Sequence, residues 1–294
     1  MDWLQALILG IIQGLTEFLP VSSSGHLIVG KELLGLEITD NIAFEIVVHC
    51  ATVLSTITIL RKEIGALLTK LFKFQWNPET QYIAMILLSM IPVMIVGLFF
   101  KDMVENLFGE GVALVGAMLL VTAVLLGLTS FKSSKIQKFK DLKFHPLNPP
   151  PAGEIVNSQL SIVNCQLSSL TWGKAFLIGL AQAVAVLPGL SRSGTTIATG
   201  LLAGVKKEDV AKFSFLMVLI PILGETLLSA MHGDFSAATS GIPASSLIVG
   251  FFAAYLCGCF ACKFMIELVK RTNLLWFALY CSIVGITALI YSLW

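Results

Sequence analysis

Eight apolar segments, two of them interrupted by polar residues, constrain this chain more than any other feature of its sequence. The six uninterrupted segments have about 20 residues each, enough to cross the roughly 30 Å hydrocarbon core of a bilayer. They lie at approximately 43–60, 82–100, 112–131, 213–231, 244–262 and 274–292. Apolar residues make up 56% of the chain and charged residues only 13%, beyond the usual composition of a soluble domain. The sequence therefore predicts an all-α integral membrane protein.

The two interrupted segments run from about 3 to 35 and from about 173 to 204. Pro20 and the serines after it break the first, and the stretch LPGLSRSGTT, residues 187–196, breaks the second. Each half has about 12 to 17 residues, which is short for a span. Each segment is therefore either one distorted crossing or a re-entrant hairpin that returns to its starting side. The N-terminus has no basic region typical of a cleavable signal peptide, so the first segment is expected to remain.

The distribution of Lys and Arg distinguishes these topologies, because cytoplasmic loops collect both residues. If both interrupted segments are re-entrant, 16 loop cations lie on one side and only Lys31 and Lys101 on the other. If both segments cross fully, the loop cations divide 10 to 8. The sequence therefore predicts six transmembrane helices plus two re-entrant helical hairpins, with both termini outside. No basic stripe accompanies the net charge of +1, so no nucleic-acid partner is expected.

The two interrupted segments also resemble each other. SSSGHLI at 22–28 aligns with SRSGTTI at 191–197 at an offset of 169, which also pairs Gly10 with Gly179. Three crossings per unit would invert the second copy, so an inverted repeat is predicted, with the two breaks meeting near the midplane. The predicted domains are a first repeat at 1–131 with hairpin 3–35, a disordered cytoplasmic linker at 132–170, and a second repeat at 171–294 with hairpin 173–204.

The residue types in the breaks predict a phosphate site. Non-helical backbone at membrane depth is tolerated where it is buried in protein or lines a cavity. Each serine-rich break precedes a helical half, and helix N-termini attract anions. Arg192, inside the second break, can bind phosphate oxygens with two parallel hydrogen bonds.

A carboxylate next to that anion needs an explanation. Glu17 lies one helical turn after Gln13 and leads into the first break. It would repel phosphate unless a divalent cation bridges the two, which we favour, or unless it is protonated and acts as an acid. His26 is a candidate nucleophile or proton shuttle, or a structural residue, and serines 22–24 are candidate attackers or helix caps.

QGLTEFLPVSSSGHL (13–27) and LPGLSRSGTT (187–196) closely resemble the two signatures of the bacitracin-resistance type undecaprenyl-pyrophosphate phosphatases. FEIVVH (44–49) and FSFLMVLIPILG (213–224) are similar to that family too, so the resemblance covers nearly the whole chain except the linker. It implies a metal-dependent membrane enzyme that removes the terminal phosphate of the lipid carrier's pyrophosphate through a periplasmic-facing site. Such an enzyme recycles the carrier for peptidoglycan and other envelope polysaccharides and confers bacitracin resistance.

Carried over by position, the resemblance implies a set of site residues. The catalytic residues are Glu17, Ser23, His26 and Arg192, and Glu17 is also the metal ligand. The substrate-binding residues that it implies are Gln13, Gly189, Ser191, Ser193 and Thr196, and Ser22, Ser24 and Gly25 of the first motif are further candidates. Glu45 and His49, one turn apart on the first span, are expected to support the site. The nucleophile stays open: Ser23 with His26 as base, His26 itself, or metal-activated water.

The expected cofactor is a divalent cation, Mg or Ca, and the expected partners are a polyprenyl pyrophosphate and membrane lipids of the bacterial inner membrane. A homodimer is compatible with the sequence but not required by it. Phosphatidic-acid phosphatase chemistry needs His and Asp where this chain has Ala198 and Leu202. An inverted-repeat transporter or lipid flippase is the rival of another class, because fold alone does not determine function. The stretch CGCFAC at 257–262 is expected to be helix packing rather than a metal site.

Overall fold

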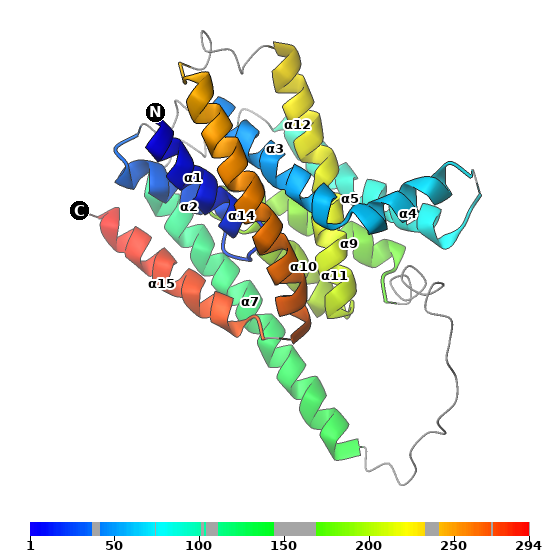
Figure 1. Cartoon of the computed structure of the whole chain (residues 1–294). Helices are drawn as coiled ribbons and strands as arrows, with labels where there is room; N and C mark the ends of the chain where they lie inside the picture. The colour runs from blue at the N-terminus through cyan, green and yellow to red at the C-terminus, as the bar shows by residue number, and fades with distance from the viewer. Residues whose placement is uncertain are drawn as a thin grey trace.

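Every regular element in the described part of the chain is an α-helix. The computed structural model describes residues 1–36, 42–73, 75–100, 103, 111–143, 169–232, 241–271 and 273–293. Its helices are α1 (Trp3–Thr16), α2 (Ser23–Leu33), α3 (Ile42–Ile59), α4 (Arg61–Leu71), α5 (Pro78–Phe99), α7 (Gly111–Lys143), α9 (Trp172–Val184), α10 (Arg192–Leu202), α11 (Lys207–Met217), α12 (Leu219–His232), α14 (Ala244–Arg271) and α15 (Leu275–Tyr291). Figure 1 shows these helices gathered into one bundle, with α14 beside α1 and α3.

Several helices are long and apolar enough to cross a membrane. Four candidate spans are Pro78–Phe99, Gly111–Phe131, Lys207–Met231 and Ala244–Val269, and α3 with α4, bent by 79°, forms a fifth when the pair is taken together. The predicted segments at 43–60 and 274–292 fall on α3 and on α15, a shorter apolar helix. The chain is therefore a multi-pass α-helical membrane protein.

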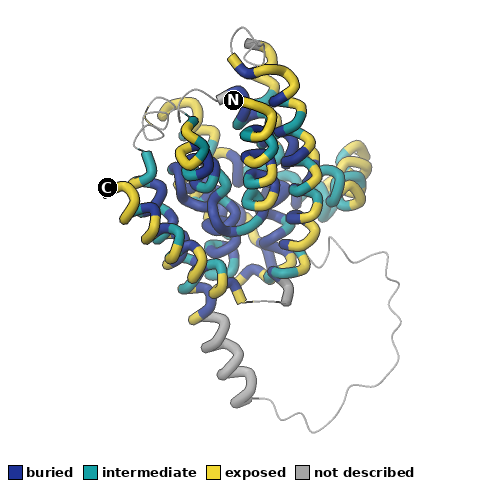
Figure 2. Tube along the Cα trace, turned by 60° about the vertical axis from the view of Figure 1, so that its left-hand side comes forward, coloured by how far each residue is buried: buried dark blue, intermediate teal, exposed yellow. Residues whose placement is uncertain are grey.

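The outward faces of the bundle carry the apolar residues that such a protein needs. Figure 2 shows the exposed residues along the outer sides of the helices and the buried ones inside. Large apolar side chains on several helices are exposed, such as Leu98 at 74%, Leu256 at 64% and Trp276 at 71%. In water these surfaces would promote aggregation, whereas lipid tails solvate them.

The structure differs from the sequence-based expectation at the fourth span. Helix α11 begins at Lys207, before the predicted start at 213, and the helix is interrupted at Val218 before α12. Pro221 lies in the first turn of α12 and has no N–H to donate to Met217, so a continuous helix would lose a hydrogen bond there. Helix α4 was not among the predicted segments, because Arg61, Lys62 and Glu63 make its first turn polar.

The predicted linker begins at 132, and the helix that precedes it extends past this position. Helix α7 continues to Lys143, because residues 132–143 contain neither Gly nor Pro and nothing in them ends a helix. At the other end of the predicted linker, Ser169 and Leu170 are buried, at 8% and 2% exposure. The middle of the linker, residues 144–168, lies outside the described residues.

Local structure recurs at the offset of 169 found in the sequence. Asp2 and Thr171 cap α1 and α9, each accepting a hydrogen bond from the backbone N–H three residues on. Ser22 and Ser191 cap α2 and α10 in the same way. Gly35 and Gly204 then end those two helices with φ of 66° and 80°, a backbone conformation that glycine adopts without steric cost. Both interrupted segments therefore have the same helix starts and stops.

Gly10 and Gly179 fix how closely each interrupted segment approaches a neighbouring helix. A Cβ at Gly10 would lie 2.5 Å from the carbonyl oxygen of Gly250 on α14, and one at Gly179 would lie 2.3 Å from that of Ser89 on α5. Neither contact can move easily, because the obstructing atom is backbone. These equivalent glycines hold the broken helices deep in the bundle.

Candidate active site

The two helix breaks lie against each other inside the bundle. The first separates α1 from α2, at residues 17–22, and the second separates α9 from α10, at residues 185–191. The Ser193 hydroxyl donates a 2.9 Å hydrogen bond to the carbonyl oxygen of Leu19, and Arg192 forms an ion pair with Glu17. The two predicted motifs, which lie far apart in the sequence, therefore form one site.

Glu17 is the centre of this site. Its Oε2 accepts hydrogen bonds from Gln13 Nε2 at 2.9 Å and from Ser23 Oγ at 2.6 Å, and its Oε1 accepts one from Arg192 Nη2. The Glu17 side chain is only 8% exposed, whereas that of Arg192 is 29% exposed. A buried carboxylate is costly unless it is paired and hydrogen-bonded, and these contacts meet that requirement.

His49 reaches the same carboxylate from α3. Its Nε2 lies 3.7 Å from Glu17 Oε2, too far for a hydrogen bond, and its Nδ1 donates to the carbonyl oxygen of Glu45 at 2.8 Å. The Glu45 carboxylate pairs with Lys31, whose side chain is completely buried. The burial of Lys31 could not be predicted, and Lys31 was counted as a loop charge, because no local sequence pattern indicates that a lysine at a helix end is buried.

The serines that begin α2 and α10 serve as helix caps. Ser22 Oγ accepts from Gly25 N at 3.2 Å, and Ser191 Oγ accepts from Gly194 N at 3.0 Å. Their remaining contacts are weak, 3.4 Å from the hydroxyls of Ser24 and Ser193, respectively. Both capping hydroxyls lie where free N–H groups of a helix N-terminus attract an anion.

The predicted glycines make room for close packing. Gly189 has a φ of 87°, and a Cβ there would lie 2.6 Å from the Cα of Val115 on α7. A Cβ at Gly25 would approach Val115 too, at 3.0 Å from its Cγ1. Thr122, one more residue of α7 that the sequence did not single out, accepts a 3.0 Å hydrogen bond from the Ser191 backbone N–H. Helix α7 therefore supports both breaks at once.

Two predicted site residues are directed toward other helices. Thr196 Oγ1 lies 2.6 Å from Ser214 Oγ on α11 and donates to the Arg192 carbonyl oxygen at 2.8 Å. Both ring nitrogens of His26 are engaged outside the Glu17 contacts: Nδ1 lies 2.7 Å from the carbonyl oxygen of Ser22, and Nε2 lies 2.8 Å from the Tyr280 hydroxyl. Tyr280 had no sequence signal, since it lies in an otherwise apolar helix.

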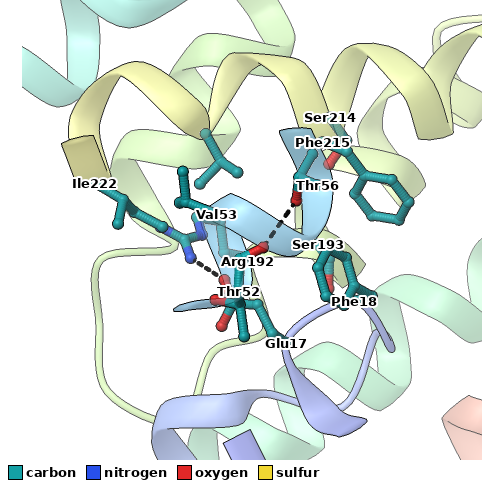
Figure 3. Close-up of a pocket in the computed structure, with 11 residues that line it drawn as sticks. Glu17, Phe18, Thr52, Val53, Thr56, Arg192, Ser193, Ser214, Phe215 and Ile222 are labelled. Atoms are coloured by element: carbon teal, nitrogen blue, oxygen red, sulfur yellow. Dashed lines mark hydrogen bonds and ion pairs between the residues drawn. The ribbon is translucent and has the colours of Figure 1, made fainter. Parts of the chain in front are cut away.

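A small cavity opens beside the Glu17–Arg192 pair (Figure 3). Phe18 and Phe215 close part of it with their rings edge to face, 5.5 Å between centroids. Its volume is about 20 Å³, room for one water molecule or a monatomic ion. Its lining residues are Glu17, Phe18, Thr52, Val53, Thr56, Arg192, Ser193, Ser214, Phe215, Val218 and Ile222.

A divalent cation at Glu17 would need several oxygen ligands. Among the residues that the structure describes, no three His, Cys, Asp or Glu side chains gather to form a metal site, and this holds for CGCFAC as well. Gln13 is fully buried, however, and its Oε1 has no hydrogen-bond partner. One carboxylate and one unpartnered amide oxygen suit a hard cation that takes its other ligands from a bound phosphate and water.

Fold and site together define a class: a multi-pass helical membrane protein in which two interrupted helices assemble a buried carboxylate, an arginine and serine hydroxyls. The chain matches the family model described as "Bacitracin resistance protein BacA" over residues 6–287. It is 52% identical over 293 residues to an undecaprenyl-diphosphatase of Bacteroides fragilis, with 99% of each chain covered. It is 51% identical over 296 residues to the enzyme of that name from Bacteroides thetaiotaomicron, with 100% of each chain covered. The chain belongs to the BacA bacitracin resistance family, as its two motifs indicated.

Proposed function

We propose that this protein is an undecaprenyl-diphosphatase, which hydrolyses undecaprenyl pyrophosphate to undecaprenyl phosphate and phosphate. The observation that carries the proposal is the convergence of Ser23 and Arg192 on Glu17 from the two breaks. The names of relatives that cover the full chain support it independently. The reaction returns the lipid carrier to peptidoglycan and other envelope synthesis, and it underlies bacitracin resistance in this family.

The substrate's charge and its tail fit different parts of the molecule. A pyrophosphate bound next to this small cavity, between the two breaks, would meet the Arg192 guanidinium, whose planar fork matches two phosphate oxygens. It also meets the N-terminal ends of α2 and α10, capped by Ser22 and Ser191. The polyprenyl tail remains among the apolar outer faces of the helices and the membrane lipids.

Ser23 is the attacking group in the proposed reaction. The Ser23 Oγ–phosphorus bond forms as the bond from that phosphorus to the oxygen of undecaprenyl phosphate breaks, and the Ser23 proton passes to Glu17, the acceptor 2.6 Å away. Water then attacks the phosphoserine, releases phosphate and restores the hydroxyl. Attack by His26, and His26 as the base of Ser23, remain competing hypotheses, although both its nitrogens have other partners.

The proposed cofactor is a divalent cation, Mg²⁺ or Ca²⁺, at Glu17. Gln13 offers the unpartnered oxygen Oε1, and the phosphate oxygens of the substrate would complete the ligand set. Bound there, the cation supplies positive charge that offsets the charge of the pyrophosphate beside the Glu17 carboxylate. Without a second carboxylate from the chain, the site is expected to bind the cation weakly until substrate is present.

The proposed membrane arrangement is an inverted repeat of two re-entrant hairpins and six spans, with both termini outside and the site open to the periplasmic side of the inner membrane. The 16 to 2 division of loop cations supports this topology. The recurrence of helix caps at the offset of 169 supports the repeats at 1–131 and 171–294.

Phosphate release by the purified protein tests this function. In detergent or lipid nanodiscs, the protein should release phosphate from a polyprenyl pyrophosphate, and chelator should abolish the release until Mg²⁺ or Ca²⁺ is restored. Glu17→Gln should remove the activity, while Glu79→Gln, on the first turn of α5, provides a matched control that should retain it. A folded wild-type protein that moves the lipid between leaflets but releases no phosphate would instead be a transporter.

A further inference from the structure

Ser22 has an unusual backbone conformation just before the predicted attacking serine. Its φ is 68°, and it is the one non-glycine residue with positive φ in the described part of the chain. Side chains of L-residues rarely adopt this conformation, and such turns persist only where the surroundings hold them. The equivalent cap in the other repeat, Ser191, has an ordinary φ of −65°. The strain therefore belongs to the first break alone.

His26 contacts this turn through both its backbone and its side chain. The Ser22 carbonyl oxygen accepts two hydrogen bonds from it, one from the His26 backbone N–H at 3.2 Å and one from Nδ1 at 2.7 Å. A carbonyl oxygen has no proton to give, so Nδ1 must carry the hydrogen. In the neutral ring Nε2 is then the acceptor, and it accepts the Tyr280 hydroxyl at 2.8 Å.

Tyr280 lies on α15, which packs against α7. Its ring lies parallel to that of His26, with centroids 5.6 Å apart and 9° between the planes. The adjacent Cys281 thiol contacts the Pro20 carbonyl oxygen at 3.5 Å, so α15 touches the first break through Cys281 and α2 through Tyr280. One turn further on, Gly285 lies so close to α7 that a Cβ there would be 2.8 Å from the Gly116 carbonyl oxygen. Helix α15 therefore places the Tyr280 hydroxyl and ring against His26.

We propose that His26 and Tyr280 are positioning residues that hold Ser22 in its left-handed turn, and thereby keep the Ser23 hydroxyl against Glu17. The proposal rests on the proposed function, since it concerns the geometry of that site. It assigns His26 a role other than base or nucleophile: its hydrogen on Nδ1 secures the loop, and its Nε2 is held by α15 rather than by Ser23.

A double-mutant cycle separates positioning from chemistry. His26→Phe keeps a planar ring against Tyr280 but loses both nitrogens, and we expect kcat to fall by about 30-fold or more with little change in KM. Ser22→Gly allows positive φ without strain and leaves an acceptable helix N-cap. If the turn is what His26 maintains, the loss caused by His26→Phe should shrink to about 5-fold or less in the Ser22→Gly background.

Two variants control this cycle. Ser191→Gly, the equivalent cap with ordinary φ, should give His26→Phe no rescue. Tyr280→Phe keeps the ring stack and removes only the hydroxyl, so its loss should be about 3- to 10-fold and should also be reduced by Ser22→Gly. An undiminished His26→Phe loss in the Ser22→Gly background would show that His26 acts in the chemistry and would overturn the proposal.

Nitrogen NMR of ¹⁵N-histidine-labelled protein gives a readout that needs no turnover. The His26 signal, assigned by its loss in His26→Phe, should show hydrogen on Nδ1 and a bare Nε2. Tyr280→Phe should shift Nε2 while Nδ1 keeps its hydrogen, and Tyr255→Phe, whose hydroxyl contacts Thr58 instead, should leave both unchanged. A hydrogen on Nε2 with Nδ1 bare would refute the pairing. A wild-type protein without phosphatase activity would remove the proposed function, yet these spectra would still decide the pairing.

Discussion

Arg192 and Glu17 form an ion pair across the two helix breaks, 175 residues apart in the sequence. Arg192 can have one of two roles in this pair. Arg192 either only neutralises a buried carboxylate or also binds the phosphate that reaches the cavity. The two purposes differ in what they need from the arginine, because a neutralising partner needs only charge, whereas a phosphate clamp needs the planar fork.

Arg192→Lys therefore distinguishes the two. We expect phosphatase activity to fall at least about 100-fold, on the order of 3 kcal/mol of transition-state stabilisation, while the protein stays folded. Steady-state kinetics with a thermal melt would measure both. Arg61→Lys, at the start of α4, should have nearly wild-type activity. Near-normal turnover in a stable Arg192→Lys protein would leave Arg192 as a charge partner only.

The covalent intermediate identifies the nucleophile. If Ser23 attacks, rapid quench with labelled substrate should trap an acid-stable phosphoserine that disappears in Ser23→Ala. An acid-labile adduct that persists in Ser23→Ala would identify His26 as the nucleophile. If no adduct forms in either protein, metal-activated water attacks directly.

The linker should tolerate deletion only up to its buried end. Removing residues 145–168 should leave activity within a few-fold, since long surface loops cost little, roughly 0.6 kcal/mol per doubling of length. Extending the deletion through Ser169 and Leu170 should destabilise the protein. The Ser169 hydroxyl donates to Asp209 at 2.6 Å and accepts from the Lys206 backbone N–H, so its loss leaves a buried carboxylate without that donor. Equal stability of the two deletion proteins would contradict this boundary.

The charge asymmetry predicts that the linker is cytoplasmic. In a background without the six native cysteines, Asn148→Cys should resist a membrane-impermeant thiol reagent added to intact cells and react after lysis. Met103→Cys, between the second and third predicted spans, should react in intact cells. Labelling at 148 from the periplasm would reverse the proposed orientation.

The sequence predicted the parts of the fold that depend on neighbouring residues. Pro20 and the serines locate the first break, and the stretch LPGLSRSGTT locates the second, because caps and breaks are set by residues a few positions apart. Glu17 and Arg192 could be assigned to one site because charges at membrane depth need a function or a partner. The structure shows that the two side chains form a direct ion pair.

The contacts that the sequence missed join residues far apart in the chain. Tyr280 binds His26 across 254 residues, and Lys31 on α2 meets Glu45 on α3, so neither has a local pattern. The positive φ of Ser22 has no local pattern either, because contacts around the turn impose it and serine itself does not favour it. The extension of α7 to Lys143 was missed for a different reason: hydropathy identifies a membrane span but not the polar helix that continues it.

The order of synthesis gives the Glu17–Arg192 pair a consequence for how the protein is made. At roughly 5–20 residues per second, a ribosome produces Arg192 about 10 to 35 seconds after Glu17. Throughout that interval the first interrupted segment has neither its arginine nor α14, against which Gly10 and Gly14 will lie. We therefore expect the first half of the chain to remain incompletely packed in the membrane until the second half is made. A nascent chain stalled before residue 192 should be degraded by membrane proteases faster than the full-length protein.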